Sequence, residues 1–153
     1  NFQNDMWRIF GHVFFGDKLH FVDQEHKTFR LEALKAFLAE TGVAIFDTGL
    51  RIRRTKNNAS DKDLEIVEQA DIDGLLRQLP QCKGVLAAGQ LATQVFMQHF
   101  GIKQMPKMGC FTEFTFEGRT LRLYRVPSSS RAYPMAVEKK AAFYQKMFDD
   151  VLR

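Results

Sequence analysis

The sequence predicts an α/β fold: a three-layer α/β/α sandwich around a short, mainly parallel sheet. Segments with helical and with strand periodicity alternate along the chain, as they do in folds built from parallel strands and crossover helices. Two strand segments, residues 43–46 and 84–88, are short and continuously apolar, which is typical of strands buried on both faces of a sheet. The 153 residues, 45% of them hydrophobic, are enough for one domain with a full core.

The predicted helices have apolar residues at intervals of three and four. They cover residues 5–15, 29–40, 72–79, 91–100 and about 134–152. Asn4 or Asp5 is suited to cap the first helix, and Gly42 stands where the second should end. The fifteen phenylalanines are spread through these helices and the strands, which indicates that most of them belong to the core.

The remaining predicted strands form a hairpin of residues 111–116 and 120–126 across Glu117-Gly118. Residues 48–63 are almost entirely polar and are expected to form a long exposed connection. Polar or small residues follow each parallel strand: Asp47, Gly89-Gln90 and the loop of residues 127–131. Because ligands bind at the carboxyl ends of such strands, we expect these three segments to converge on one edge of the sheet.

The loop after the last strand consists of Pro127, Ser128, Ser129, Ser130 and Arg131. Proline cannot donate to the sheet ladder and so ends the strand. The three hydroxyls and the guanidinium are donors and acceptors suited to phosphate or to the edges of bases. The alternative is a serine-rich turn that caps the following helix.

Composition and charge limit the possible partners, cofactors and location of the protein. The net charge of +4 and the pI of about 9.2 suit a polyanionic partner, and they also suit many metabolic enzymes. No apolar run approaches the length of a membrane span, and no signal peptide is visible. Cys82 and Cys110 are too few for a disulfide scaffold or an iron-sulfur cluster, and the four histidines lack metal-ligand spacing. We therefore expect a soluble cytoplasmic protein without a metal or other cofactor.

Two motifs at opposite ends of the chain resemble the uracil-DNA glycosylase superfamily, particularly its hypoxanthine-DNA and mismatch-specific branches. The opening Asn1-Phe2-Gln3-Asn4-Asp5-Met6-Trp7 is similar to the family's His-Pro-x-Asn-x-Phe-Trp segment, and Asn4 and Trp7 match it directly. Val126-Pro127-Ser128-Ser129-Ser130 resembles the Leu-Pro-Ser-Thr-Ser segment of the family's second active-site loop.

Three further residues follow the family's order: Asp47, Arg54 and Ser60 are similar to an Asp, a later Arg and a Ser-x-Asp pattern after its second strand. The chain departs from the family at Asn1 and Phe2, where the family has His and Pro, and at Arg131, where Pro is usual. The resemblance places the family's first strand and Gly-x-x-Pro loop before Asn1. It thus implies that residues 1–153 are a single glycosylase-like domain lacking its N-terminal strand.

The activity that the resemblance implies is hydrolysis of the N-glycosidic bond of a deaminated base, such as uracil, hypoxanthine or xanthine, flipped out of DNA. Asn4 would position the attacking water, and residues 127–131 would contact the DNA and the vacated space. Trp7, Asp47, Arg54 and Ser60 would support the site. The expected partner is damaged DNA. We expect the protein to be a monomer that does not associate with a membrane and needs no protein partner.

Other interpretations stay open. Asn4 is also suited to capping, Trp7 to the core, and Asp47 to anchoring a loop. The run containing Arg51, Arg53, Arg54 and Lys56 is either a solvated face or a phosphate contact. The whole chain could also be an inactive nucleic-acid-binding relative, or a nucleotide-binding α/β enzyme, although it has no Gly-x-Gly-x-x-Gly or Walker sequence.

Overall fold

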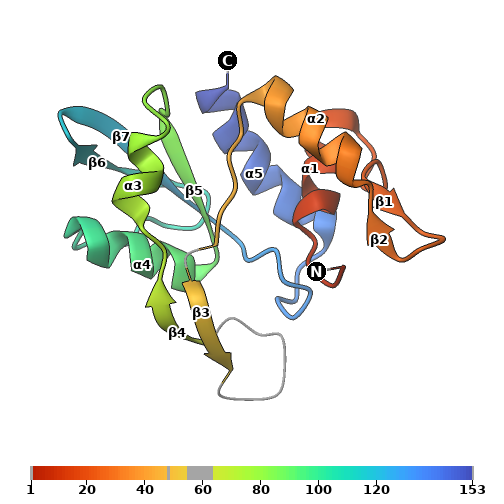
Figure 1. Ribbon diagram of the computed structural model, residues 1–153, viewed down its shortest axis with the longest axis horizontal. Helices are drawn as coiled ribbons and strands as arrows, with labels where there is room; N and C mark the ends of the chain where they lie inside the picture. Colours follow the sequence, from red (N-terminus) through yellow and green to blue (C-terminus); the bar gives the residue numbers. More distant parts are fainter. Residues whose placement is uncertain (1, 48, 55–63, 153) are drawn as a thin grey trace. The chain divides into compact units, whose positions relative to one another are not determined.

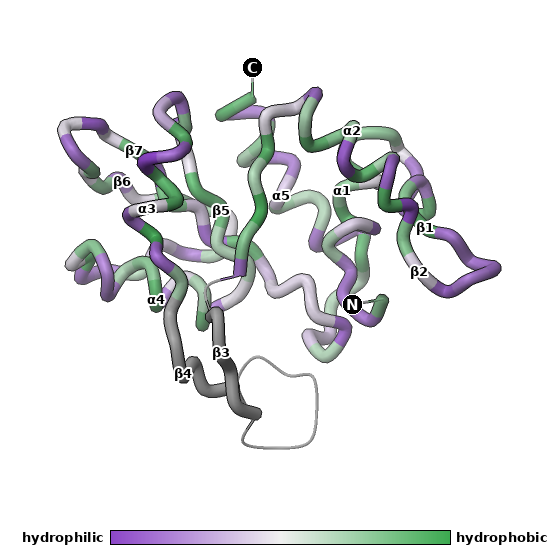
Figure 2. The backbone as a smooth tube through the Cα atoms, viewed as in Figure 1, coloured by the Kyte–Doolittle hydropathy of each residue, from purple (hydrophilic) through white to green (hydrophobic). Residues whose placement is uncertain are grey.

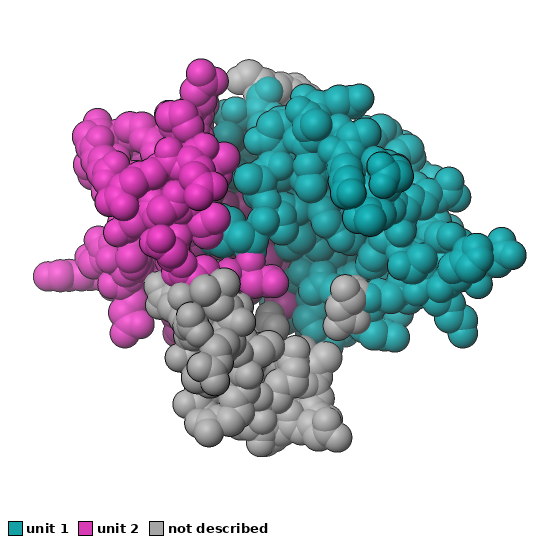
Figure 3. Space-filling model, in the orientation of Figure 1, with its two compact units in different colours: residues 1–46, 129–153 teal, residues 47–128 magenta. Residues whose placement is uncertain are grey.

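The computed structural model describes residues 2–47, 49–54 and 64–152. The chain forms two compact units, shown in Figure 3. Unit 1 contains Asn1–Phe46 and Ser129–Arg153, and unit 2 contains Asp47–Ser128. Helices and strands are both present, with parallel and antiparallel pairing in one sheet, so the predicted mixed α/β class is confirmed. Along the described part of the chain, no helix has both the length and the apolar character needed to cross a lipid bilayer.

Unit 1 is mainly helical. Its elements are α1 (Met6–Phe15), β1 (Val22–Asp23), β2 (Thr28–Phe29), α2 (Leu31–Thr41) and α5 (Val137–Val151). Helices α1 and α5 lie side by side although they come from opposite ends of the chain (Figure 1). Gly42 ends α2 in the left-handed conformation, with φ of 73°, as its position predicts.

An aromatic cluster forms the core of unit 1. Phe10 is 3% exposed, and its ring meets that of Phe148 edge-on at 5.4 Å between centroids. Phe14 contacts Phe37 at 4.8 Å and Phe148 at 5.0 Å. The Phe10–Phe148 and Phe14–Phe37 pairs are edge-to-face, and pairs of this kind contribute roughly 0.5–1.5 kcal/mol each beyond the burial of their area. Helices α1, α2 and α5 all supply rings to this cluster, but only seven of the fifteen phenylalanines are buried, so the expectation that most of them are core residues is met only in part.

Unit 2 contains a three-stranded sheet in the order β5-β7-β6. Its elements are β3 (Gly49–Arg54), β4 (Leu64–Gln69), α3 (Ile72–Arg77), β5 (Gly84–Ala88), α4 (Gln90–Phe100), β6 (Phe111–Phe116) and β7 (Arg119–Val126). Strand β5 pairs with β7 in parallel, and β6 pairs with β7 as the predicted antiparallel hairpin. Strand β5 is apolar along most of its length (Figure 2), as expected of a strand in a parallel pair.

Two of the three predicted strand-end segments are neighbours. The amide of Gly89 donates to the carbonyl of Val126 at 2.9 Å, so the residues after β5 and β7 begin side by side. Gly89 has φ of 97° and ψ of 165°, a conformation that is essentially restricted to glycine. This allows the chain to turn directly from β5 into α4.

The third segment differs from its prediction. Residues 43–46 form no strand, and Ile45 is 40% exposed. A strand needs a partner for its backbone groups, and none of the described strands pairs with this run, so apolar composition was not sufficient. The prediction that Asp47 follows a strand is therefore wrong.

The connection predicted for residues 48–63 is wrong in part, because Gly49–Arg54 is β3 and pairs with β4. Backbone pairing does not require apolar side chains, and the polar composition concealed this hairpin. Residues 55–63 lie outside the described part of the chain. The β1–β2 hairpin was also not predicted, because strands of two residues are too short to show periodicity.

Helix α5 begins at Val137, three residues later than Pro134. Its N-cap is Ala136, which makes no capping hydrogen bond through its side chain. The backbone between Ser130 and α5 is instead folded by turns, with the amide of Tyr133 donating to the carbonyl of Ser130 at 3.0 Å. The alternative in which the serines cap this helix is therefore wrong.

Candidate functional site

The two motifs that the sequence singles out meet in unit 1. Asn4 and Ser130 form an isolated antiparallel β-bridge. Next to it, the amide of Asp5 donates to the carbonyl of Ser129 at 2.7 Å. These backbone bonds fix the N-terminal segment against the end of the serine loop.

Asn4 has a structural role in the first turn of α1. Its Oδ1 accepts a hydrogen bond from the amide of Met6 at 2.9 Å, which satisfies a donor that the helix itself cannot pair. The side-chain nitrogen, Nδ2, donates to none of the described residues. The residue is half-buried, so one end of the amide is used for the fold and the other is accessible to a water molecule.

A buried ionic cluster lies beside Asn4. Asp5 is 6% exposed, and its Oδ1 accepts from Nη1 of Arg8 and from Nε of Arg131, both at 3.2 Å. Burial lowers the pKa of the Arg8 guanidinium, the nearby Arg131 lowers it further, and Asp5 acts in the opposite direction. Arg131 is thus held by a carboxylate at the bridge between the two motifs.

The loop residues differ in exposure. Ser128 and Ser129 are buried, Ser130 is half-buried and Arg131 is exposed. The Oγ of Ser130 accepts from the amide of Ala132 at 3.2 Å. Only the last two residues of this loop are therefore open to a ligand in this conformation.

Lys140 holds the loop from α5. Its Nζ donates to the carbonyl of Ser130 at 2.9 Å, and the residue is completely buried. The ammonium lies 5.6 Å from the ring centroid of Tyr133, where the electron-rich face of the ring is favourable for a cation. Lys140 was not predicted from the sequence. Its place one helical turn before the buried Tyr144 was the available signal.

Trp7 packs against the core of unit 1. Its ring meets Phe10 edge-on at 5.6 Å and Phe21 at 6.3 Å between centroids. The residue is half-buried, and these contacts agree with the packing role that was the alternative to a DNA contact.

The other predicted supporting residues belong to unit 2 or lie outside the described part. Asp47 is exposed. Arg54 is the last residue of β3 and stands opposite Leu64 of β4. Ser60 lies outside the described residues, as does Asn1, the first residue of the N-terminal motif.

The described side chains contain no group of three or more His, Cys, Asp or Glu that could hold a metal ion. The candidate site is therefore defined by an amide, a set of hydroxyls and a buried cluster of opposite charges. The chain shows no significant similarity to any protein-family model, curated protein or solved structure with which it was compared.

Proposed function

We propose that this chain is a DNA glycosylase of the uracil-DNA glycosylase superfamily, closest to the hypoxanthine-DNA and mismatch-specific branches. Its fold would then be a three-layer α/β/α sandwich around a mainly parallel sheet. The observation that carries the proposal is the backbone contact between Asn4 and the Ser129-Ser130 segment, which joins the two motifs of the resemblance in one site.

In this mechanism the N-glycosidic bond of an extruded deoxynucleotide is hydrolysed. As the base leaves, positive charge develops at the sugar and negative charge on the base. The accessible amide of Asn4 orients the attacking water. A neutral amide is a weak base, so stabilisation of the leaving group contributes most of the rate. The preferred substrates are therefore bases that leave easily, such as uracil, hypoxanthine and xanthine.

The exposed part of Arg131 contacts the DNA. Its side chain is 46% exposed while Nε is bound to Asp5, so the guanidinium is oriented before DNA arrives. A planar guanidinium donates two parallel hydrogen bonds to a phosphate, which suits the strained backbone around a flipped base. Ser130 lies next to it and adds a hydroxyl.

The test uses the full-length protein with duplexes that each contain one uracil, hypoxanthine or xanthine. Alkali then cleaves the strand wherever a base has been removed. We expect excision of at least one of these bases, and we expect Asn4→Ala to lower the single-turnover rate by about 10²–10⁴, the range typical of a group that handles a proton or water.

Asn4→Asp is the matched variant. It retains an oxygen that can accept from the Met6 amide, so it separates loss of the side-chain amide from loss of the hydrogen bond to the start of α1. Circular dichroism and thermal unfolding check that both variants are folded. A folded Asn4→Ala protein with full activity would exclude the role of Asn4. Binding without excision would favour the inactive relative, and absence of both would refute the DNA proposal.

A further inference from the structure

Unit 1 has a surface hollow of about 290 Å³, which shares Arg131 with the proposed DNA contact and is otherwise lined by residues to which the proposed reaction gives no role. Three basic residues line it: Arg8 from α1, Lys27 from the turn between β1 and β2, and Arg131 from the loop before α5. Among the described residues, no acidic one lines it. A volume near 300 Å³ is at the lower end of the range for small-molecule sites.

Arg8 supplies unused donors to this hollow. The side chain is only 7% exposed. All the side-chain hydrogen bonds that Arg8 makes with the described residues are donated by Nη1. They go to the carbonyls of Phe2 and Asn4 and to Oδ1 of Asp5. Nε and Nη2, which form one edge of the guanidinium, donate to none of the described residues.

This edge is open to a ligand. No completely buried side-chain nitrogen or oxygen among the described residues lacks a partner, so Nε and Nη2 of Arg8 reach the surface. Arg8 is one of the residues that line the hollow, so a ligand in the hollow can contact this side chain. Two parallel N–H groups on such an edge match the spacing of two oxygens of a phosphate.

The charge around the hollow is positive. Asp5 neutralises one of the two guanidinium groups that it binds, which leaves about two positive charges among Arg8, Lys27 and Arg131. Lys27 is exposed, and no acidic side chain among the described residues pairs with it. A monoester phosphate carries about 1.5 to 2 negative charges at neutral pH, so it matches this excess better than a carboxylate does, whereas a strand, whose phosphodiesters carry one charge each, would match it with two neighbouring phosphates.

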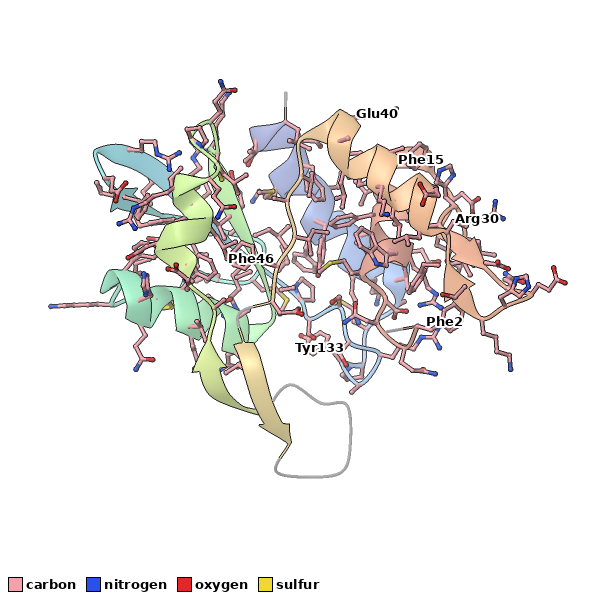
Figure 4. All side chains as sticks on the ribbon, viewed as in Figure 1. Phe2, Phe15, Arg30, Glu40, Phe46 and Tyr133 are labelled. Carbon is pink, nitrogen blue, oxygen red and sulfur yellow. The ribbon has the colours of Figure 1, made fainter. Side chains whose placement is uncertain are left out.

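The rest of the wall is mostly apolar, with Phe2, Leu19 and Val22 contributing side chains. Figure 4 labels Phe2, which comes from the N-terminal segment beside the β1–β2 hairpin. The guanidinium carbon of Arg8 lies 4.6 Å from the centroid of the Phe2 ring. A ligand with its phosphate on the arginine edge would therefore place its organic part against an apolar surface.

We propose that this hollow binds the phosphate of a nucleotide, either free or within a nucleic-acid strand, with Arg8 as the central donor and Lys27 and Arg131 at the rim. The sugar or base lies against the wall that contains Phe2 and Val22. This site does not require that a glycosidic bond be cleaved.

The test is a titration of the ¹⁵N-labelled full-length protein, followed by NMR at constant ionic strength. The added ligands are inorganic phosphate, deoxyadenosine monophosphate, a lesion-free single-stranded pentanucleotide and acetate. We expect saturable shifts at the Arg8 and Arg131 Nε–H groups and at the Lys27 amide. Deoxyadenosine monophosphate should bind more tightly than inorganic phosphate if the site takes free nucleotides. A preference for the pentanucleotide instead identifies a strand as the source.

Lys27→Gln removes a rim charge from an exposed turn and should weaken binding by about 5- to 10-fold, as expected for loss of one charge-assisted contact. Lys146→Gln, on the exposed side of α5, makes the same change in net charge and should leave affinity unchanged. Equal weakening by the two substitutions, equal shifts with acetate, or the lack of a saturable response would each overturn the proposal. Because the ligands contain no lesion, the result is independent of excision activity.

Discussion

At the scale of single residues, one carboxylate organises the candidate site. Asp5 accepts from two arginines, and its own amide donates to the carbonyl of Ser129. The two arginines are not equivalent, since the side chain of Arg8 is 7% exposed and that of Arg131 is 46% exposed. Removing the partner of a largely buried charge costs more than removing an exposed charge, because water replaces the lost contact less completely.

This difference predicts the effects of Asp5→Asn and Arg131→Gln. Asp5→Asn leaves the Arg8 cation buried without a countercharge and should lower the free energy of unfolding by about 3 kcal/mol. Arg131→Gln should lower it by less than about 1 kcal/mol, because the lost pair is partly solvated. Urea unfolding followed by the fluorescence of Trp7, the only tryptophan, measures both. Equal losses for the two variants would contradict this account of Asp5.

At the scale of elements, the β1–β2 hairpin carries residues to the phosphate hollow. Phe29 of β2 packs against Phe2 at 5.3 Å between ring centroids, and the turn places Lys27 at the rim. The turn appears as a hydrophilic segment in Figure 2. It is closed by Asp23, whose carboxylate accepts from the His26 ring at 2.8 Å and from the His26 amide at 3.2 Å. Such bonds stabilise a short hairpin that has little surface to bury.

These contacts give the hairpin a predicted pH dependence. The hydrogen bond from the His26 side chain, followed by that from the His26 amide, lowers the pKa of Asp23 below its usual value. A carboxylate whose pKa is lower in the folded state stabilises that state above its unfolded pKa of about 3.9, and this contribution is lost as the pH falls through the folded pKa. We therefore expect the β1–β2 hairpin to lose this stabilisation in acid, at pH values below the ordinary pKa of an aspartate carboxyl group.

NMR titration of the Asp23 carboxyl carbon measures this shift. His26→Ala removes the side-chain contact and keeps the backbone amide, so the Asp23 pKa should move part of the way back toward its ordinary value. An unchanged titration midpoint in that variant would show that the His26 ring is not the main cause.

At the scale of the whole molecule, unit 1 depends on both ends of the described chain. Helix α1 and helix α5 share the aromatic cluster, and the loop that precedes α5 makes the bridge to Asn4. Unit 2 is formed from one continuous segment between them. Folding of unit 1 therefore requires contacts that are distant in sequence, which are slower to form than local ones.

A chain shortened to residues 1–128 tests this dependence. It retains the sequence of unit 2 and lacks α5, so the rings of α1 lose Tyr144 and Phe148. We expect Trp7 to emit at the wavelength of the urea-unfolded protein, because its core is incomplete. The matched full-length variant, Phe148→Ala, should keep native emission and lose about 3–5 kcal/mol of stability. Native Trp7 emission from the shortened chain would show that α5 is not required.

Local pattern was enough to predict most helices and the β6–β7 hairpin. Apolar spacing and end signals such as Gly42 are properties of neighbouring residues, so they can be read without knowing the fold. The strand predicted at residues 43–46 failed because pairing depends on a partner elsewhere in the chain. The β1–β2 hairpin was missed because its strands contain only two residues each.

For the site, the sequence alone singled out Asn4 and the loop of residues 127–131, because an amide at a helix start and a run of hydroxyls after a strand are visible in order along the chain. Tertiary structure alone decided that Asn4 lies against Ser130, that Arg8 and Lys140 are buried, and that Asp5 joins Arg8 to Arg131. The physical reason is that the burial and pairing of a charge are set by residues distant in sequence, which no local pattern specifies.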